Sequence, residues 1–372
     1  MTSHMVDKHL AHIAGLEAKF GTVSDEVAVA LNTLARLICQ YEEPADAVSY
    51  FSRCIAIRQE LNGPAAILPD LDKWIDQDNP VGFWIREPFM RKRLDIKTEL
   101  FGEFDPWVAE ECDGLASTYV HVRRFAEAKP LLERSLAAKT RLDGENSADV
   151  AATLARLVDV CLRTDHREQA DRYLERCVKA NEAAFGPNRK EFGDRLVALA
   201  VMYVANSQTP RRAVQADMTR RGFSVFEKAL PSIEKICGPD SFEVQKALEA
   251  MSQACLESDQ FWKAEPLLRR LLATTERVYG NDAAALLWIL IELALGYGLE
   301  RSDRAEAFVE RSFDVMKVLL DSRTSTYRGR IKNLPGRNDV LYGPGQSGLL
   351  EKLLRAAEIV RGNIRRQWGA SR

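Results

Sequence analysis

The sequence predicts an all-α protein in which helical hairpins stack into an elongated solenoid. Glycines recur at a near-constant interval, and apolar residues follow each of them at helical spacing. Of the 372 residues, 46% are apolar and 28% are charged, so the chain can form a core and is not a disordered segment. A hairpin that leaves one apolar face uncovered is stable only against a neighbouring hairpin, which favours an open array over separate globular domains.

Seven glycines mark the ends of successive repeat units. They lie 42, 39, 42, 42, 52 and 42 residues apart, and several follow an aromatic residue. We expect each glycine to adopt the left-handed conformation that caps the second helix of its unit, because glycine reaches it without steric cost. These residues are Gly21, Gly63, Gly102, Gly144, Gly186, Gly238 and Gly280.

The first helix of each unit, called helix A, is predicted by apolar residues ten, thirteen and fourteen positions after the glycine. This spacing is the buried stripe of an amphipathic helix. The residues at ten are Leu31, Cys112, Leu154, Leu196, Leu248 and Leu290. Those at fourteen are mostly small: Ala35, Ala116, Val158, Ala200, Ser252 and Ala294. Small side chains there allow neighbouring helices to approach closely.

The second helix, called helix B, carries an alanine twenty-six positions after the glycine in four units: Ala47, Ala128, Ala170 and Ala264. Pro88, Pro130 and Pro266 each lie fourteen residues before a unit-closing glycine, so we expect them near the start of helix B, where a missing N–H costs little. Cys54 and Cys177 share one repeat position with Ser135 and Ala229, which predicts a small buried side chain at that position.

The period divides the chain into a solenoid over residues 1–320 and a C-terminal region. The second unit has a shortened first helix around 68–77, while Pro88 and residues 89–101 keep its phase. The predicted segments are a half-repeat at 4–20, units at 21–63, 64–102, 103–144, 145–186, 187–238, 239–280 and 281–320, a Gly/Pro/Arg-rich loop at 321–348, and an amphipathic helix at 349–368.

The fifth unit is ten residues too long, and its insertion lies at about residues 207–225. We interpret it as an extension of helix B, with Thr209 as N-cap before Pro210 and a cluster of arginines. The extension is either a solvated projection or a surface that contacts a partner, because insertions into repeats often lie on a binding face.

Three of these segments resemble the 42-residue tetratricopeptide repeats of kinesin light chain and of many bacterial proteins: LNTLARLICQYEEPADAVSYFSRCIAIRQELNG, CDGLASTYVHVRRFAEAKPLLERSLAAKTRLDG and LEAMSQACLESDQFWKAEPLLRRLLATTERVYG. The resemblance covers about residues 1–320. It implies a right-handed superhelix of about seven hairpins that serves as a protein–protein interaction scaffold or adaptor. Its partner is expected to be a peptide or helix of another protein, held in the concave groove that the A helices line.

The same resemblance implies which residues line the groove, on two positions of helix A. The family favours asparagine at the first, and Asn32 keeps it. The groove is expected to be polar near the N-terminus and more apolar near Val197 and Val201, or these side chains serve packing and solvation only. The implied binding residues are Asn32, Arg36, Asp113, Ser117, Asp159, Val197, Val201, Glu249, Gln253 and Ile291.

Charge is divided unevenly between the array and the C-terminal region. Residues 321–372 contain nine Arg and two Lys against two Asp and two Glu, a net charge of +7, which leaves −9 on residues 1–320. The predicted helix at 349–368 has three open interpretations: it caps the array, it occupies the groove and regulates the adaptor, or it contacts nucleic acid or a membrane surface through Arg361, Arg365 and Arg366.

Catalytic motifs are not evident. Gly343, Gly345 and Gly348 match GxGxxG, but the βαβ unit and the following acidic residue that a dinucleotide site needs do not accompany them. His9 and His12 share a helix face without a third ligand nearby. We therefore expect a non-enzymatic protein that binds no cofactor or metal.

The seven cysteines form no CxxC pair, and no stretch approaches the ~18 apolar residues of a membrane span. The first twenty residues lack a signal-peptide pattern. These features predict a protein of the cytoplasm with reduced thiols.

Overall fold

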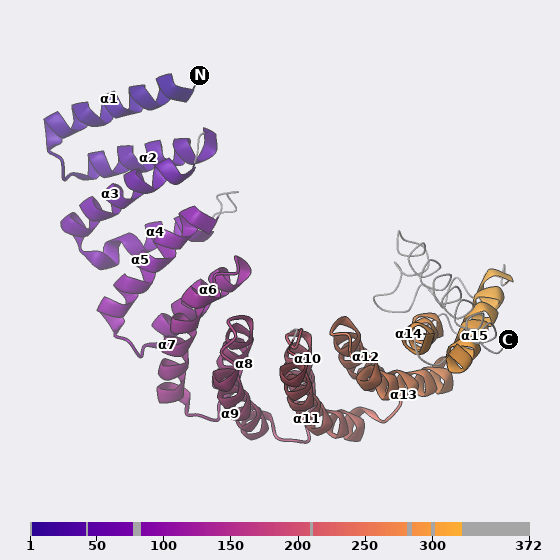
Figure 1. The fold of residues 1–372 in the computed structure, drawn as a ribbon. Coiled ribbons are helices and arrows are strands. Elements are labelled where there is room, and N and C mark those ends of the chain that lie inside the picture. The colour runs from indigo at the N-terminus through magenta and orange to yellow at the C-terminus, as the bar shows by residue number, and fades with distance from the viewer. Residues whose placement is uncertain are drawn as a thin grey trace. The chain divides into compact units, whose positions relative to one another are not determined.

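The computed structural model describes residues 2–41, 44–76, 83–208, 211–280, 285–298 and 302–321. Successive helices pack as hairpins, which confirms the predicted all-α fold class (Figure 1). The chain forms two compact units, residues 1–184 and 185–372, which are described separately. The first contains α1 (Thr2–Phe20), α2 (Asp25–Tyr41), α3 (Pro44–Asn62), the 3₁₀ helix η1 (Pro64–Ile67), α4 (Leu68–Asp76), α5 (Phe83–Phe101), α6 (Pro106–His121), α7 (Phe125–Asp143), α8 (Ala148–Arg163) and α9 (Arg167–Phe185). The second contains α10 (Lys190–Ala205), α11 (Arg212–Cys237), α12 (Phe242–Glu257), α13 (Phe261–Tyr279), α14 (Leu286–Gly298) and α15 (Ser302–Asp321).

The predicted apolar stripe is the core of each unit. The six apolar residues named above at ten positions after a unit glycine are each at most 1% exposed, and the six small residues at fourteen positions are fully buried at 0%. The four alanines of helix B are also fully buried, as are Cys54, Ser135, Cys177 and Ala229. Small residues therefore lie on both helices where the hairpins approach one another, as the sequence predicts.

The unit-closing glycines take a conformation that differs from the expected one. Their φ angles are positive, between 72° and 92°, but Gly144 and Gly280 have ψ angles of 165° and 168°. This extended, positive-φ region is open to glycine and closed to other residues, whereas the predicted left-handed helical cap would also admit asparagine. The backbone at these positions therefore requires glycine more strictly than the predicted left-handed cap would.

The left-handed caps lie instead where helix A turns into helix B. Arg123, Asp165 and Asp259 have φ angles of 63°, 62° and 54°. At the first of them, the N–H of Arg124 bonds the carbonyl of Tyr119 at 2.8 Å, which is the Schellman arrangement. The residues after the closing glycine begin the next helix, and Ser147 caps α8 through the N–H of Val150.

The prolines of helix B lie deeper than expected. Pro88, Pro130 and Pro266 are each the sixth residue of their helix, α5, α7 and α13. At this depth the missing N–H removes one helical hydrogen bond. The clash that proline imposes falls on the carbonyl four residues earlier, which belongs to the first turn of the helix, where the backbone is freest to adjust.

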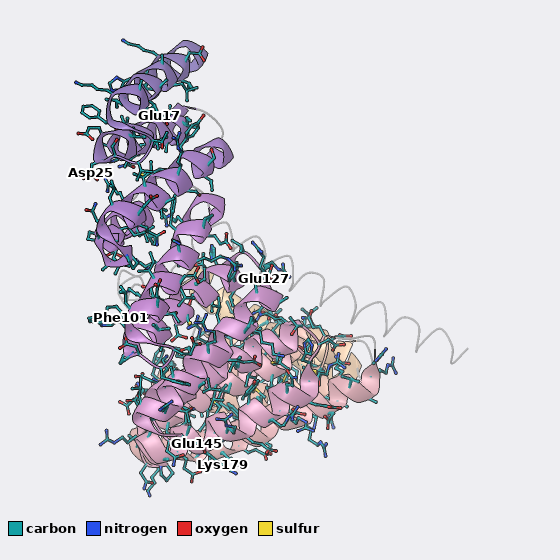
Figure 2. The ribbon with its side chains drawn as sticks, turned by 90° about the vertical axis from the view of Figure 1, so that its left-hand side faces the viewer. Glu17, Asp25, Phe101, Glu127, Glu145 and Lys179 are labelled. Carbon is teal, nitrogen blue, oxygen red and sulfur yellow. The ribbon has the colours of Figure 1, made fainter. Side chains whose placement is uncertain are left out.

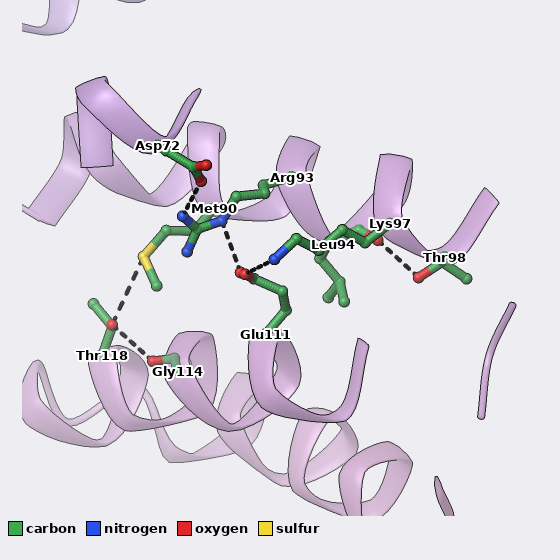
Figure 3. A network of polar contacts seen from close by, with 9 residues as sticks. All are labelled: Asp72, Met90, Arg93, Leu94, Lys97, Thr98, Glu111, Gly114 and Thr118. Carbon is green, nitrogen blue, oxygen red and sulfur yellow. Dashed lines mark hydrogen bonds and ion pairs between the residues drawn. The ribbon is translucent and has the colours of Figure 1, made fainter. Parts of the chain in front are cut away.

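A buried ion network joins the shortened second unit to the third. Glu111 of α6 is 7% exposed and accepts hydrogen bonds from Arg93 Nε at 2.9 Å and Lys97 Nζ at 2.6 Å, both on α5 (Figure 3). Arg93 also donates to Asp72 of α4 at 2.7 Å. α4 has nine residues and buries Leu71 and Ile75, and the network links it to both following helices.

The insertion extends helix B, as predicted, and α11 is 26 residues long. Its N-cap is Arg211, while Thr209, the predicted cap, lies outside the described residues. The segment reaches the next hairpin: Gln208 donates to the carbonyl of Glu257 and Gln215 to that of Ser258, both at 2.7 Å. Ser258 Oγ in turn donates to the carbonyl of Val204 at 2.8 Å.

The C-terminal predictions lie outside the described residues. They concern the loop at 321–348 beyond Asp321, the helix at 349–368, and the basic patch of Arg361, Arg365 and Arg366.

A tyrosine, glutamate and arginine form a polar cluster between helix B and the next helix A. Arg91 donates to Tyr119 Oη at 2.8 Å, and both residues hydrogen-bond the carboxylate of Glu87. Burial raises the pKa of Glu87, but the hydrogen bonds from Tyr119 and Arg91 outweigh burial and lower it below its ordinary value. Burial and Glu87 together raise the pKa of Tyr119 to about 12. The same trio recurs at Tyr297, Glu265 and Arg269.

Gly144→Ala should reduce the free energy of unfolding by about 1–3 kcal/mol, because alanine is strained at φ 82°. A Cβ at this position meets nothing within 4 Å, so the loss comes from the backbone alone. Gly114→Ala is the matched control: Gly114 lies inside α6 with equally open surroundings, and alanine there should stabilise by ~0.5–1 kcal/mol. Urea unfolding of both variants measures the difference, and a neutral effect of Gly144→Ala would contradict the assignment.

Glu87→Gln should alter the acid stability of the protein. Since the pKa of Glu87 is lowered on folding, its carboxylate stabilises the native state above its ordinary pKa of 4.5, and this contribution disappears as the pH falls through the lower folded value. The difference in free energy of unfolding between wild type and Glu87→Gln should be constant near neutral pH and shrink below pH 4.5. Urea titrations at several pH values test this, with the exposed Glu182→Gln as control. A pH-independent difference would refute it.

Candidate functional site

The predicted groove residues lie on the A helices, and most are held by intramolecular contacts. In the compact unit of residues 1–184, Arg156 of α8 reaches back to α6. Its guanidinium is 3.2 Å from Asp113 Oδ1, donates to the Asp113 carbonyl at 2.9 Å and also hydrogen-bonds Ser117. Lys139 of α7 pairs with the second carboxylate oxygen of Asp113 and donates to Thr153 at 3.0 Å. The space between α6 and α8 is thus filled by a polar network.

Two other predicted residues of the first unit differ in how they are held. Asp159 pairs with Arg163 one turn further along α8 at 2.8 Å. Asn32 of α2 is half-buried, and its Oδ1 has no hydrogen-bond partner among the described residues. The Oδ1 of Asn32 is itself buried, so a peptide N–H would reach it only if the side-chain amide turned outward, whereas the carboxylate of Asp159 is already engaged. Arg36 is exposed on the same helix as Asn32.

In the unit of residues 185–372, the repeat positions that carry the polar network of α6 and α8 are apolar. Val197 and Val201 of α10 occupy the repeat positions of Asp113 and Ser117. Twelve residues after the unit glycine, where α8 has Arg156, α10 has Ala198 and α12 has Ala250. The arginine that bridges α6 and α8 therefore has no counterpart here, and neither do the groups that it bonds.

A cavity of about 390 Å³ opens between α10 and α12 as a result. Val197 and Ala247 are buried in its wall at 8% and 4% exposure, while Phe242 is 49% exposed. The apolar surface is left uncovered because the facing side chains are alanines. The lining residues are Lys190, Asp194, Val197, Ala198, Val201, Phe242, Glu243, Lys246, Ala247 and Ala250.

Close packing on the opposite face of α10 fixes one wall of this cavity. Gly193 faces α11, where an added Cβ would lie 2.4 Å from Ile233 Cγ1. Gly222 of α11 comes equally close to α10, since an added Cβ would lie 2.9 Å from the Ala200 carbonyl. These contacts seat α10 closely against α11, while α10 also packs directly against α12.

Four charged residues surround the apolar lining. Lys190 Nζ donates to Glu243 Oε1 at 3.1 Å and links the two helices. This hydrogen bond raises the pKa of Lys190. The pKa of Glu243 is lowered, first by its backbone N–H at the start of α12 and then by Lys190. With Asp194 and Lys246 included, the rim has two charges of each sign and does not select a strongly charged ligand.

The remaining predicted residues lie outside this cavity. Glu249 is half-buried on α12, and the exposed Gln253 donates to Glu257 at 3.0 Å. The prediction that Ile291 lines the groove was wrong, because the residue is 1% exposed and belongs to the core of α14. An isoleucine in a helix whose neighbouring residues are also apolar gives no periodic signal for which face is buried.

Sequence reasoning missed most of the cavity. It named Val197 and Val201 and omitted Lys190, Phe242, Lys246 and the alanines, because a small residue on helix A indicates packing as readily as an empty site. A signal was nonetheless present in the repeat. Twelve positions after the unit glycine, Arg156 is replaced by Ala198 and Ala250, and α10 has valine at the positions eleven and fifteen after the glycine.

The described part of the chain contains neither a candidate membrane-spanning helix nor a candidate metal site. None of its helices is both long and apolar enough to cross a membrane, and no three His, Cys, Asp or Glu side chains gather there as metal ligands would. Burial raises the pKa of Cys112 to about 11 and that of Cys255 to about 12, so these thiols remain protonated.

Comparison with known proteins identifies the repeat. Residues 109–183 match the tetratricopeptide repeat family. A structure of a putative kinesin light chain with nearly identical TPR-like repeats from Podosopora anserina is 13% identical, with a TM-score of 0.44, covering 59% of this chain and 99% of that one. BtubC (BKLC) from P. vanneervenii is 18% identical, with a TM-score of 0.39, covering 68% and 90%. No curated protein matches the sequence.

Asp113→Ala should reduce the free energy of unfolding by about 2 kcal/mol, because Lys139 and Arg156 both lose their shared acceptor. These side chains are only 18% and 32% exposed, so water replaces the carboxylate poorly. Asp159→Ala is the control, since its partner Arg163 is 41% exposed on the same helix; its loss should stay below ~0.5 kcal/mol. Thermal unfolding compares the two, and equal losses would show that the network is not cooperative.

Proposed function

Because the chain contains tetratricopeptide repeats, a fold that is generally a protein-interaction module and typically non-catalytic, we propose that it is a scaffold or adaptor that binds a peptide or partner helix along its A helices. Protein partners fit the fold, whereas no cofactor is needed for such binding. The buried, protonated thiols suit the reducing cytoplasm.

The α10–α12 cavity is the observation that carries this proposal. It is concave, apolar and bounded by two rigid helices, which are the features of a site that receives an anchoring side chain. A few buried anchors supply most of the affinity of a protein interface. One large aliphatic or aromatic side chain of the partner would cover Val197, Val201 and Ala247.

Polar residues on the A helices would orient the rest of the partner. Ser117, Asp159, Glu249 and Gln253 would exchange their present intramolecular contacts for contacts with the partner, and Asn32 would turn its unpaired amide oxygen outward. Exposed polar contacts of this kind fix register and add little affinity. We therefore expect the apolar cavity to determine which peptides bind and the polar positions to discriminate among them.

Ala250→Leu should fill the cavity and weaken binding of an apolar anchor at least tenfold. A displayed library of random peptides, selected on the full-length wild-type chain, supplies the probes. The selected peptides should share a large apolar residue and should lose affinity for Ala250→Leu.

Ala216→Leu serves as the control, since it adds the same side chain to an exposed position of α11, and its affinities should equal those of wild type. Matching melting temperatures would show that both variants are folded. Selected peptides that bind all three proteins equally would overturn the proposed site.

A further inference from the structure

The turn between α5 and α6 exposes a cluster of large apolar side chains. Leu100 is 39% exposed, Phe101 and Phe104 are each 41% exposed, and Trp107 is 56% exposed. All four lie within eight consecutive residues of the compact unit of residues 1–184. We call them the 100–107 patch. Single exposed apolar residues are normal on a protein surface, but a contiguous group that includes two phenylalanines and a tryptophan is typical of a contact surface.

The patch is held in place before any partner arrives. The rings of Phe101 and Trp107 meet edge to face with centroids 5.0 Å apart, and the Arg141 guanidinium lies 4.5 Å above the ring of Phe104. Trp107 belongs to the first turn of α6, and its N–H is bonded by the N-cap Asp105 at 2.8 Å. Fixed aromatic residues lose little conformational entropy on binding, which is why they dominate interface energies.

Other turns of the same kind expose less apolar surface. The residue two positions before the unit glycine is an exposed aliphatic at Leu61, Leu142, Ile236 and Val278 as well. At the described turns that follow these residues, fewer than three exposed aromatic side chains are present, in contrast to the 100–107 patch. Figure 2 shows Phe101 on the edge of the first unit that also carries Asp25 and Glu145, opposite the edge of Glu127. The patch therefore lies away from the turns that connect helix A to helix B.

Acidic residues outnumber basic ones in the two chain segments that contribute to the patch. Residues 99–110 contain four carboxylates and no cation, and residues 141–149 contain three carboxylates and one cation, Arg141. Glu103 is bonded by Arg134 at 2.7 Å. In the described residues, Glu99, Glu110 and Glu145 have no ion pair. The A-helix side differs, because Asp113 and Asp159 are already neutralised by their own cations.

We propose that the 100–107 patch binds a segment of a partner protein that presents large apolar side chains among lysines or arginines. The apolar residues of the segment cover Phe101 and Trp107, and its cations meet the free carboxylates at the rim. Lysine and arginine also stack on exposed aromatic faces, as Arg141 does on Phe104. The acidic rim opposes adsorption to anionic lipid or nucleic acid, which leaves a basic amphipathic segment as the fitting occupant.

The test uses the full-length chain and two synthetic peptides. One is an amphipathic helix built of leucine and lysine, and its twin carries glutamate in place of lysine. Fluorescence anisotropy should show that the lysine peptide binds and weakens steeply as salt rises, while the glutamate twin does not bind. Trp107→Ser should weaken the lysine peptide at least tenfold.

Trp262→Ser is the matched control, because Trp262 is 50% exposed in the other unit, and it should leave the affinity unchanged. Equal affinity of wild type and Trp107→Ser, or equal binding of both peptides, would overturn the proposal. Neutral phosphatidylcholine vesicles form a third arm, and binding to them that requires Trp107 would assign the patch to a membrane instead. Because Val197 and Ala250 lie in the other unit, this outcome does not depend on the function proposed for the α10–α12 cavity.

Discussion

A helical hairpin cannot bury both of its apolar faces by itself, and the rest of this structure follows from that constraint. Each hairpin must lie against the next one, so the contact positions of both helices need small side chains. They have them: the small residues fourteen positions after six of the unit glycines are fully buried, and so are the four alanines of helix B. Where still closer contact is needed, Gly193 and Gly222 replace larger residues between α10 and α11. Packing at this density fixes the spacing of the helices, and the spacing decides how much room remains between neighbouring A helices.

That room is filled or left empty by very few side chains. Between α6 and α8 it contains Arg156, which bonds Asp113 and Ser117. Between α10 and α12 the corresponding positions are alanine and valine, and a cavity remains. The backbones also differ, because α10 and α12 approach each other more closely than α6 and α8 do, so both the helix spacing and the side chains distinguish the two places. A repeat array can in this way present a polar, self-satisfied surface in one unit and an apolar site in another without changing its fold.

Periodicity predicted the helices, the buried stripe and the long α11, because these features depend on residues of one unit and its nearest neighbours. It did not predict the conformation of Gly144, since several positive-φ regions favour glycine and only the structure distinguishes them. It also missed the contacts of Arg156, because a long side chain that reaches another repeat obeys no helical spacing. Ile291 was wrongly predicted to line the groove for a related reason: in a helix whose residues are mostly apolar, the sequence does not mark the exposed face.

The extension of α11 has a consequence for how the cavity responds to a ligand. Gln208 and Gln215 bond the carbonyls that end α12, and Ser258 bonds back to Val204 at the end of α10. The two cavity walls are thereby cross-tied at one end, and opening either helix locally breaks contacts of the other. The α10–α11 and α12–α13 hairpins should therefore fluctuate as one cooperative body, with amide exchange that is slow on both walls together. A ligand that enters such a body meets a site whose ordering entropy was lost during folding, so little of its binding energy is spent on closing the site.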